Sequence, residues 1–143
     1  MTYRPYSAFV SPSLDYIRTN TTGVTINKGT PIRMNASGDP DFIDPSIESQ
    51  VIAIAAVAQD SVANGVQGVF VTSGKVQNLS VSFLHGDSIW LSKTGGLTDI
   101  KPSEGVNGFV SGDFVVMLGV IAKNEANPSL KDLILHIDIM GQL

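Results

Sequence analysis

The side chains best suited to acid–base chemistry are two histidines, each close in sequence to a carboxylate. His85 and Asp87 flank Gly86, and a histidine beside a carboxylate is the smallest unit that moves a proton near neutral pH. A hydrolase also needs a nucleophile or a metal, and the chain has no Gly-x-Ser-x-Gly or His-x-x-x-His motif. We therefore expect His85 to be a turn residue and the protein not to be an enzyme.

The second histidine lies near the C-terminus. His136 and Asp138 are two residues apart in a segment with a strand pattern, so their side chains point to the same side. This spacing would suit a pair of metal ligands, but no second histidine is near in sequence. We expect His136 to face solvent or an interface, and no metal site.

Three carboxylates gather in a short acidic segment. Asp39, Asp41 and Asp44 offer the oxygen ligands that calcium prefers. They lack the spacing of a calcium-binding loop, and Pro40 and Pro45 favour a rigid surface loop. A solvated loop is the favoured interpretation, and a cation site used in assembly stays open.

Cofactor motifs are not evident. Residues 65–68 and 105–108 each read Gly-x-x-Gly, but neither is followed by Gly-Lys-Ser/Thr or by a helical pattern, so both predict turns. The single Trp90 stands between Ile89 and Leu91 in an alternating segment. This position favours an anchor in the core or in an interface over a platform for a sugar.

Alternation of apolar and polar residues indicates strands. Leu79, Val81 and Phe83 alternate with serines, and residues 132–140 do the same over a longer run. In the longer run one face is apolar and the other is only partly polar, which suits packing against a neighbour. The apolar face carries Leu133, Leu135, Ile137 and Ile139, and the other carries Ile134, His136, Asp138 and Met140.

Glycines mark the turns between these segments. Residues 29–34, 86–91 and 112–117 each begin with Gly and read like a turn that leads into a strand. Asn64-Gly65, Thr72-Ser73-Gly74 and Thr94-Gly95-Gly96 predict hairpin turns. Residues 51–58 have a helical alternative, but their β-branched residues favour a buried strand. The sequence predicts an all-β fold, a small antiparallel barrel or sandwich of short strands.

Composition limits the classes of partner. Charged residues make up 15% of the 143 residues, against roughly 25% in an average soluble domain, which leaves more surface for dry contacts. The net charge is −4, and no base lies between Arg33 and Lys75, so we expect no nucleic-acid partner. Cysteine is absent, which excludes disulfides and thiol chemistry. No apolar run is long enough to span a membrane and no signal peptide is evident, so we expect synthesis in a cytoplasm and no membrane partner.

Residues 1–22 differ from the rest in having no sustained period. They carry prolines and four aromatic side chains, which predicts an extended N-terminal arm before a β-domain at 23–143. Two alternatives stay open: the arm docks on a partner subunit, or it is an edge strand folded onto its own domain. The aromatic residues are Tyr3, Tyr6, Phe9 and Tyr16.

From Gly29 onward the order of these motifs resembles that of tailed-phage capsid decoration, or cement, proteins. The matching motifs are Gly29-Thr-Pro-Ile, Ile52-Ala-Ile-Ala-Ala-Val-Ala-Gln, Asn64-Gly-Val-Gln-Gly-Val, Gly86-Asp-Ser-Ile-Trp-Leu, Gly95-Gly-Leu-Thr, Val116-Met-Leu-Gly-Val-Ile and Asp132-Leu-Ile-Leu-His-Ile. The resemblance implies a β-domain, commonly trimeric, that sits on the outer surface of the virion capsid and clamps adjacent major capsid subunits. It implies no catalytic residues and no cofactor.

An alternative within the same fold class is a head-fibre or tail-associated adhesion module that binds a host glycan through its loops. Trp90 and the acidic segment are the features that favour this alternative. For the leading interpretation, the partner-binding candidates are the four arm aromatics, Trp90 and His136.

Overall fold

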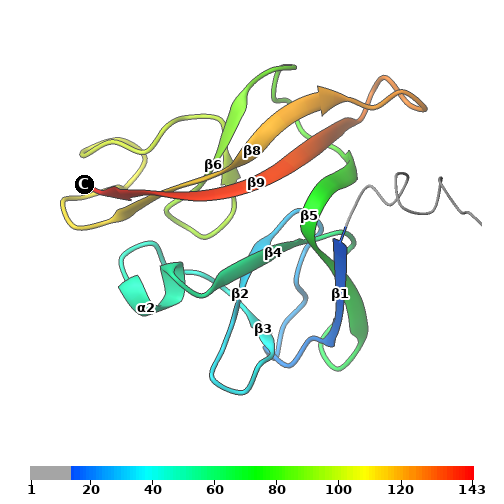
Figure 1. Ribbon diagram of the computed structural model, residues 1–143, viewed down its shortest axis with the longest axis horizontal. Helices are drawn as coiled ribbons and strands as arrows, with labels where there is room; N and C mark the ends of the chain where they lie inside the picture. Colours follow the sequence, from blue (N-terminus) through cyan, green and yellow to red (C-terminus); the bar gives the residue numbers. More distant parts are fainter. Residues whose placement is uncertain (1–13) are drawn as a thin grey trace, which may run out of the picture.

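The computed structural model describes residues 14–143, and the regular secondary structure of this part of the chain is nearly all β (Figure 1). The predicted all-β class is confirmed. The elements are β1 (Leu14–Thr19), β2 (Pro31–Met34), β3 (Pro40–Asp41), α2 (Glu48–Val51), β4 (Ile54–Ala58), β5 (Gln67–Leu79), β6 (Ser88–Leu91), β7 (Leu97–Thr98), β8 (Phe114–Lys123) and β9 (Lys131–Gln142).

The strands form one curled antiparallel sheet. Their order is β3-β2-β4-β5-β9-β8-β6-β7, with β1 paired to β5 beside this path. The sheet folds over into two layers as a half-barrel, with β6, β8 and β9 in one layer and β1 to β4 in the other (Figure 1). The end strands β3 and β7 have two residues each and do not pair with each other, so the barrel is not closed.

Strand β5 belongs to both layers. Residues 67–73 pair with β1, and Phe70 and Val71 also pair with β4, whereas from Gly74 onward β5 pairs with β9. Gly74 has a φ of +96°, a conformation that redirects the strand at little cost for glycine. The predicted hairpin turn at Thr72-Ser73-Gly74 is therefore wrong, because the chain bends there without reversing.

The main core fills the space between the two layers. Val57 and Val71 reach it from the first layer, and β8 and β9 supply much of the rest. Its members are Ile43, Val51, Val57, Val71, Val76, Leu79, Ile89, Leu91, Val116, Leu118, Ile121, Leu133 and Leu135.

A second, smaller core lies on the other face of β2, β4 and β5. Ala56, Ala58 and Phe70 belong to it, while their neighbour Val57 faces the main core. Strand β4 is therefore buried on both faces, which explains its unbroken apolar run. The predicted strand is confirmed for 54–58. At Val51, which is the last residue of the short helix α2, the helical alternative for this segment is correct.

The strand predicted through Phe83 ends earlier. β5 stops at Leu79, and residues 80–87 are not paired in a sheet. Val81 and Phe83 nevertheless pack against the main core while the serines between them are exposed. The alternation correctly predicted the burial of the side chains, but it does not report whether the backbone has a strand beside it.

The other turn predictions agree with the structure. Gly29, Gly86 and Gly112 have positive φ, and each lies two residues before a strand begins. Gly95 lies in the turn between β6 and β7, where its N–H donates to the carbonyl oxygen of Ser92 at 3.0 Å. The predicted C-terminal strand is confirmed as β9.

Candidate interaction surfaces

His85 lies in a turn, as predicted. Its side chain is exposed, and the carboxylate of Asp87 is engaged by the backbone, since the N–H of Leu84 donates to Asp87 Oδ2 at 2.8 Å. The Asp87 N–H in turn donates to the carbonyl oxygen of Leu84 at 3.1 Å. This aspartate closes the turn that leads into β6, and no hydrogen bond joins it to His85 in residues 14–143.

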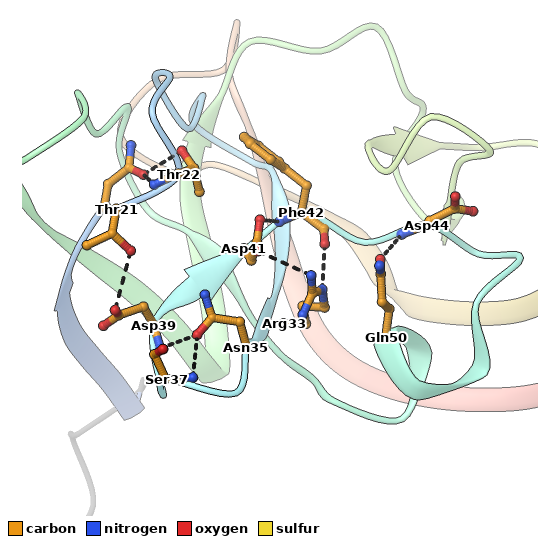
Figure 2. Close-up of polar contacts among 11 residues, drawn as sticks. Thr21, Thr22, Arg33, Asn35, Ser37, Asp39, Asp41, Phe42, Asp44 and Gln50 are labelled. Carbon is orange, nitrogen blue, oxygen red and sulfur yellow. Dashed lines mark hydrogen bonds and ion pairs between the residues drawn. The ribbon is translucent and has the colours of Figure 1, made fainter.

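The acidic segment divides its carboxylates among separate partners (Figure 2). Asp39 accepts a hydrogen bond from the hydroxyl of Thr21 at 3.3 Å. Asp41 forms an ion pair with Arg33, whose Nη2 lies 3.2 Å from Asp41 Oδ2. Because each carboxylate has its own protein partner, the segment has the contacts of a hydrogen-bonded surface loop.

Asp44 lies apart from the other two and opens the turn before α2. Hydrogen bonds from the Ser46 hydroxyl, at 2.6 Å, and from its backbone N–H, at 2.9 Å, hold the pKa of the Asp44 carboxyl below its usual value. Asp44 is therefore ionised at neutral pH. Across the described residues, no group of three or more histidine or acidic side chains is placed to hold a metal ion.

Trp90 is buried within its own chain. It lies in β6 opposite Thr98 and Met117, and only 8% of the residue is exposed. The ammonium of Lys101 lies 5.6 Å from the centroid of its ring, within range of a cation–π contact. Of the two positions expected for Trp90, in the core or in an interface, this is the core position.

Among the aromatic residues of the predicted arm, Tyr16 falls in the described part of the chain. It lies in β1 and packs against the second core, with the Arg18 guanidinium 4.5 Å from its ring centroid. Residues 14–19 are thus an edge strand on their own domain. Tyr3, Tyr6 and Phe9 lie outside the described residues.

The outward face of β9 is the clearest exposed surface that combines apolar and polar groups. Ile134 and Met140 are each 51% exposed, and His136 and Asp138 lie exposed between them. Within the described residues no hydrogen bond or ion pair joins His136 to Asp138. His136, one of the predicted partner-binding residues, therefore lies on an exposed surface.

A hollow of about 270 Å³ lies beside the β6–β7 turn. Its polar lining includes Ser92, Thr94, Thr98 and Asn107, over an apolar part formed by Leu97 and Phe109. Lys93 lies at the same place, fixed by an ion pair of 2.6 Å with the buried carboxylate of Asp113. Hydroxyl and amide groups over an apolar surface are suited to a small, neutral, hydroxylated ligand.

Sequence reasoning missed a buried polar network at the other end of the same layer. Asn124 Nδ2 donates to Asn78 Oδ1 at 2.7 Å and to Asp132 Oδ1 at 2.9 Å. The backbone N–H of Asn78, which has a φ of +64°, donates to Asp132 Oδ1 at 3.1 Å. The network ties the end of β5 to the β8–β9 connection, and the separation of 54 residues between Asn78 and Asp132 leaves no local signal for it.

Comparisons with models of known protein families, with curated proteins and with solved structures found no match. A search of the helical residues in the described range found none long and apolar enough to cross a membrane.

Proposed function

We propose that this protein is a non-enzymatic structural module that binds the outer surface of a tailed-phage capsid and clamps adjacent major capsid subunits. The observation that carries the proposal is the outward face of β9, where Ile134 and Met140 are exposed on either side of His136 and Asp138. The resemblance of the turn and strand motifs to capsid decoration proteins supplies the identity of the partner.

The chemistry of this face suits contact with a protein. Interfaces place apolar groups at the centre and polar groups where water reaches them, and aliphatic side chains on a sheet present a firm surface. From Ile134 to Met140 the strand spans about 20 Å, at roughly 3.3 Å per residue. This length is sufficient for one strand to contact a neighbouring subunit along most of a small interface.

Binding to the assembled shell would stabilise it by mass action, because a ligand that prefers the assembled state shifts the equilibrium toward it. A trimer would present three copies of the face at once. Once one copy is bound, the others bind at high effective concentration, so three modest contacts give a firm attachment.

The test is co-sedimentation of the full chain with capsids that lack it. We expect saturable binding, and at least about a tenfold loss of affinity, equivalent to about 1.4 kcal/mol, when Ile134→Asp and Met140→Asp are combined. The matched control combines Ile52→Asp with Val66→Asp, two exposed positions in the other layer, and should bind like the parent. Failure of the parent to bind, or equal binding by the β9 variant, contradicts the proposal.

A second candidate function is adhesion to a glycan, which the hollow beside the β6–β7 turn favours through its hydroxyl and amide lining. Saturable binding on a glycan array, lost on Thr98→Val and accompanied by no affinity for capsids, would support this candidate over the first.

A further inference from the structure

The second half of β9 has a free edge. β9 pairs with β8 along most of its length, but it pairs with β5 only through residues 131–135 (Figure 1). From residue 136 to residue 142, no other described strand lies on the edge opposite β8. Within the described residues, no side chain or loop donates a hydrogen bond to the backbone of 136–141 either.

The free edge arises because β5 turns away at Gly74 to pair with β1 and β4. β5 has an open edge of its own, but there a side chain takes the place of a strand. Gln59 Nε2 donates to the carbonyl oxygen of Gln77 at 3.2 Å, and the Gln77 N–H donates to Gln59 Oε1 at 3.3 Å. Among residues 14–143 no such cap lies on the edge of β9, and Ile139 beside this edge is 40% exposed although it faces the core side. An open apolar edge is recognised by another extended strand.

A second edge without a neighbouring strand lies on β1, where one side chain makes a long contact, since Arg18 Nη1 donates to the carbonyl oxygen of Ile17 at 3.4 Å. This strand pairs with β5, and no other described strand lies on its far side. The Asn20 N–H donates to the carbonyl oxygen of Val66 at 2.9 Å, which extends the same ladder. Because ladder bonds alternate along a strand, residues 15, 17 and 19 direct their backbone groups away from β5. Ile17, in the middle of this edge, is 56% exposed.

We propose that the free edge of β9 in one copy pairs antiparallel with the free edge of β1 in a second copy. The two edges are seven and six residues long and match in chemistry. A register that sets Ile139 opposite Ile17 also sets Asp138 opposite Arg18, which brings two exposed isoleucines together and two opposite charges together.

The faces of the two strands match as well. Ile139 lies opposite Val116, a residue of the main core, so it points to the core side of its layer. Ile17 is two residues from Asp15, which lies opposite the main-core residue Val71, so it too points to the core side. The paired strands would continue one sheet into the next copy without reversing its faces.

This pairing joins different surfaces of the two copies, so each copy offers one β9 edge and one β1 edge. Such a head-to-tail contact closes into a ring or continues as a chain. A ring of three would be the trimer of the proposed function. The inference specifies how the trimer of the proposed function would form, and only the number of three copies rests on that proposal. The strands can pair without binding to a capsid.

The test uses light scattering on the full chain across a range of concentrations. We expect the parent to form a closed oligomer and Asp138→Arg or Arg18→Asp to weaken self-association at least tenfold. The double variant Arg18→Asp with Asp138→Arg should restore self-association to within about threefold of the parent. Asp60→Arg changes the net charge as Asp138→Arg does, at an exposed position away from both edges, and should leave the oligomer intact.

Circular dichroism melts of each variant establish that the single changes do not unfold the chain. A monomeric parent, single variants that associate like the parent, or a double variant that is not restored would each overturn the inference. Capsid co-sedimentation separates the two proposals. An oligomer that ignores capsids contradicts the proposed function alone, and a monomer that binds capsids contradicts this inference alone.

Discussion

The two halves of β9 have the same alternating sequence pattern and opposite surroundings. In residues 131–135 the strand lies between β5 and β8, and Leu133 and Leu135 are buried. In residues 136–142 it pairs with β8 alone among the described strands, and the core-side residue Ile139 is 40% exposed. Residues 131–135 contribute side chains to the main core, whereas residues 136–142 leave backbone and apolar groups exposed for contact.

The difference originates outside β9, at the bend of β5. Gly74 turns β5 from one layer into the other, and the strand leaves β9 at Leu135, the residue opposite Gly74. The bend at Gly74 thus sets where the open edge of β9 begins. Two pairs of substitutions and one single substitution test this division of the strand.

The largest difference is expected between alanine substitutions in the two halves. Leu133→Ala leaves a cavity in the main core and should lower the free energy of unfolding by about 2–5 kcal/mol. Ile139→Ala removes a side chain that is already partly in water and should cost less than about 1.5 kcal/mol. Urea denaturation at low protein concentration measures both, and equal losses would contradict the division.

Substitutions at two glycines on the β8–β9 ladder should differ less in their effect on the free energy of unfolding. A Cβ at Gly119 would collide with the backbone carbonyl oxygen of Ile134, whereas a Cβ at Gly141 meets no atom within 4 Å. Gly119→Ala should therefore lower the free energy of unfolding by about 2 kcal/mol or more, and Gly141→Ala by about 1 kcal/mol from its positive φ. Thermal unfolding that shows the reverse order would mean that the halves are not packed as described.

The smallest effect on stability is expected at the capped edge of β5. Gln59→Ala removes two hydrogen bonds to Gln77 and should cost about 1 kcal/mol or less, because water replaces the amide. It should also raise self-association, since it opens an edge on β5 in addition to those on β9 and β1. Light scattering identical to that of the parent would show that the Gln59 amide does not protect this edge.

Local patterns predicted much of the fold, because they report the surroundings of side chains. The run at 54–58 is apolar on both faces since β4 lies between two cores, and the alternation in β9 follows one buried face. Glycines at 29, 86 and 112 were correctly predicted to precede strands, because positive φ is a local requirement.

Features that depend on distant pairing could not be predicted in this way. The residues around Gly74 have the pattern of a hairpin turn. The chain bends there instead of reversing, because β5 pairs with β9 from Gly74 onward. The contact of Asn78 with Asp132 and the cap of Gln59 on Gln77 join residues far apart in the chain. Alternation alone predicted that Ile134, His136, Asp138 and Met140 share one face of a strand. The open edge beside this face could not be predicted, because it depends on where β5 leaves β9.

Hydrogen–deuterium exchange along β9 tests the central claim most directly. In a dilute, monomeric sample we expect slow exchange for the amides of 131–135 and faster exchange for those of 136–142, and we expect the second set to become protected when copies associate. Uniform protection along β9 in the monomer, or no gain in protection at 136–142 on association, would contradict the account.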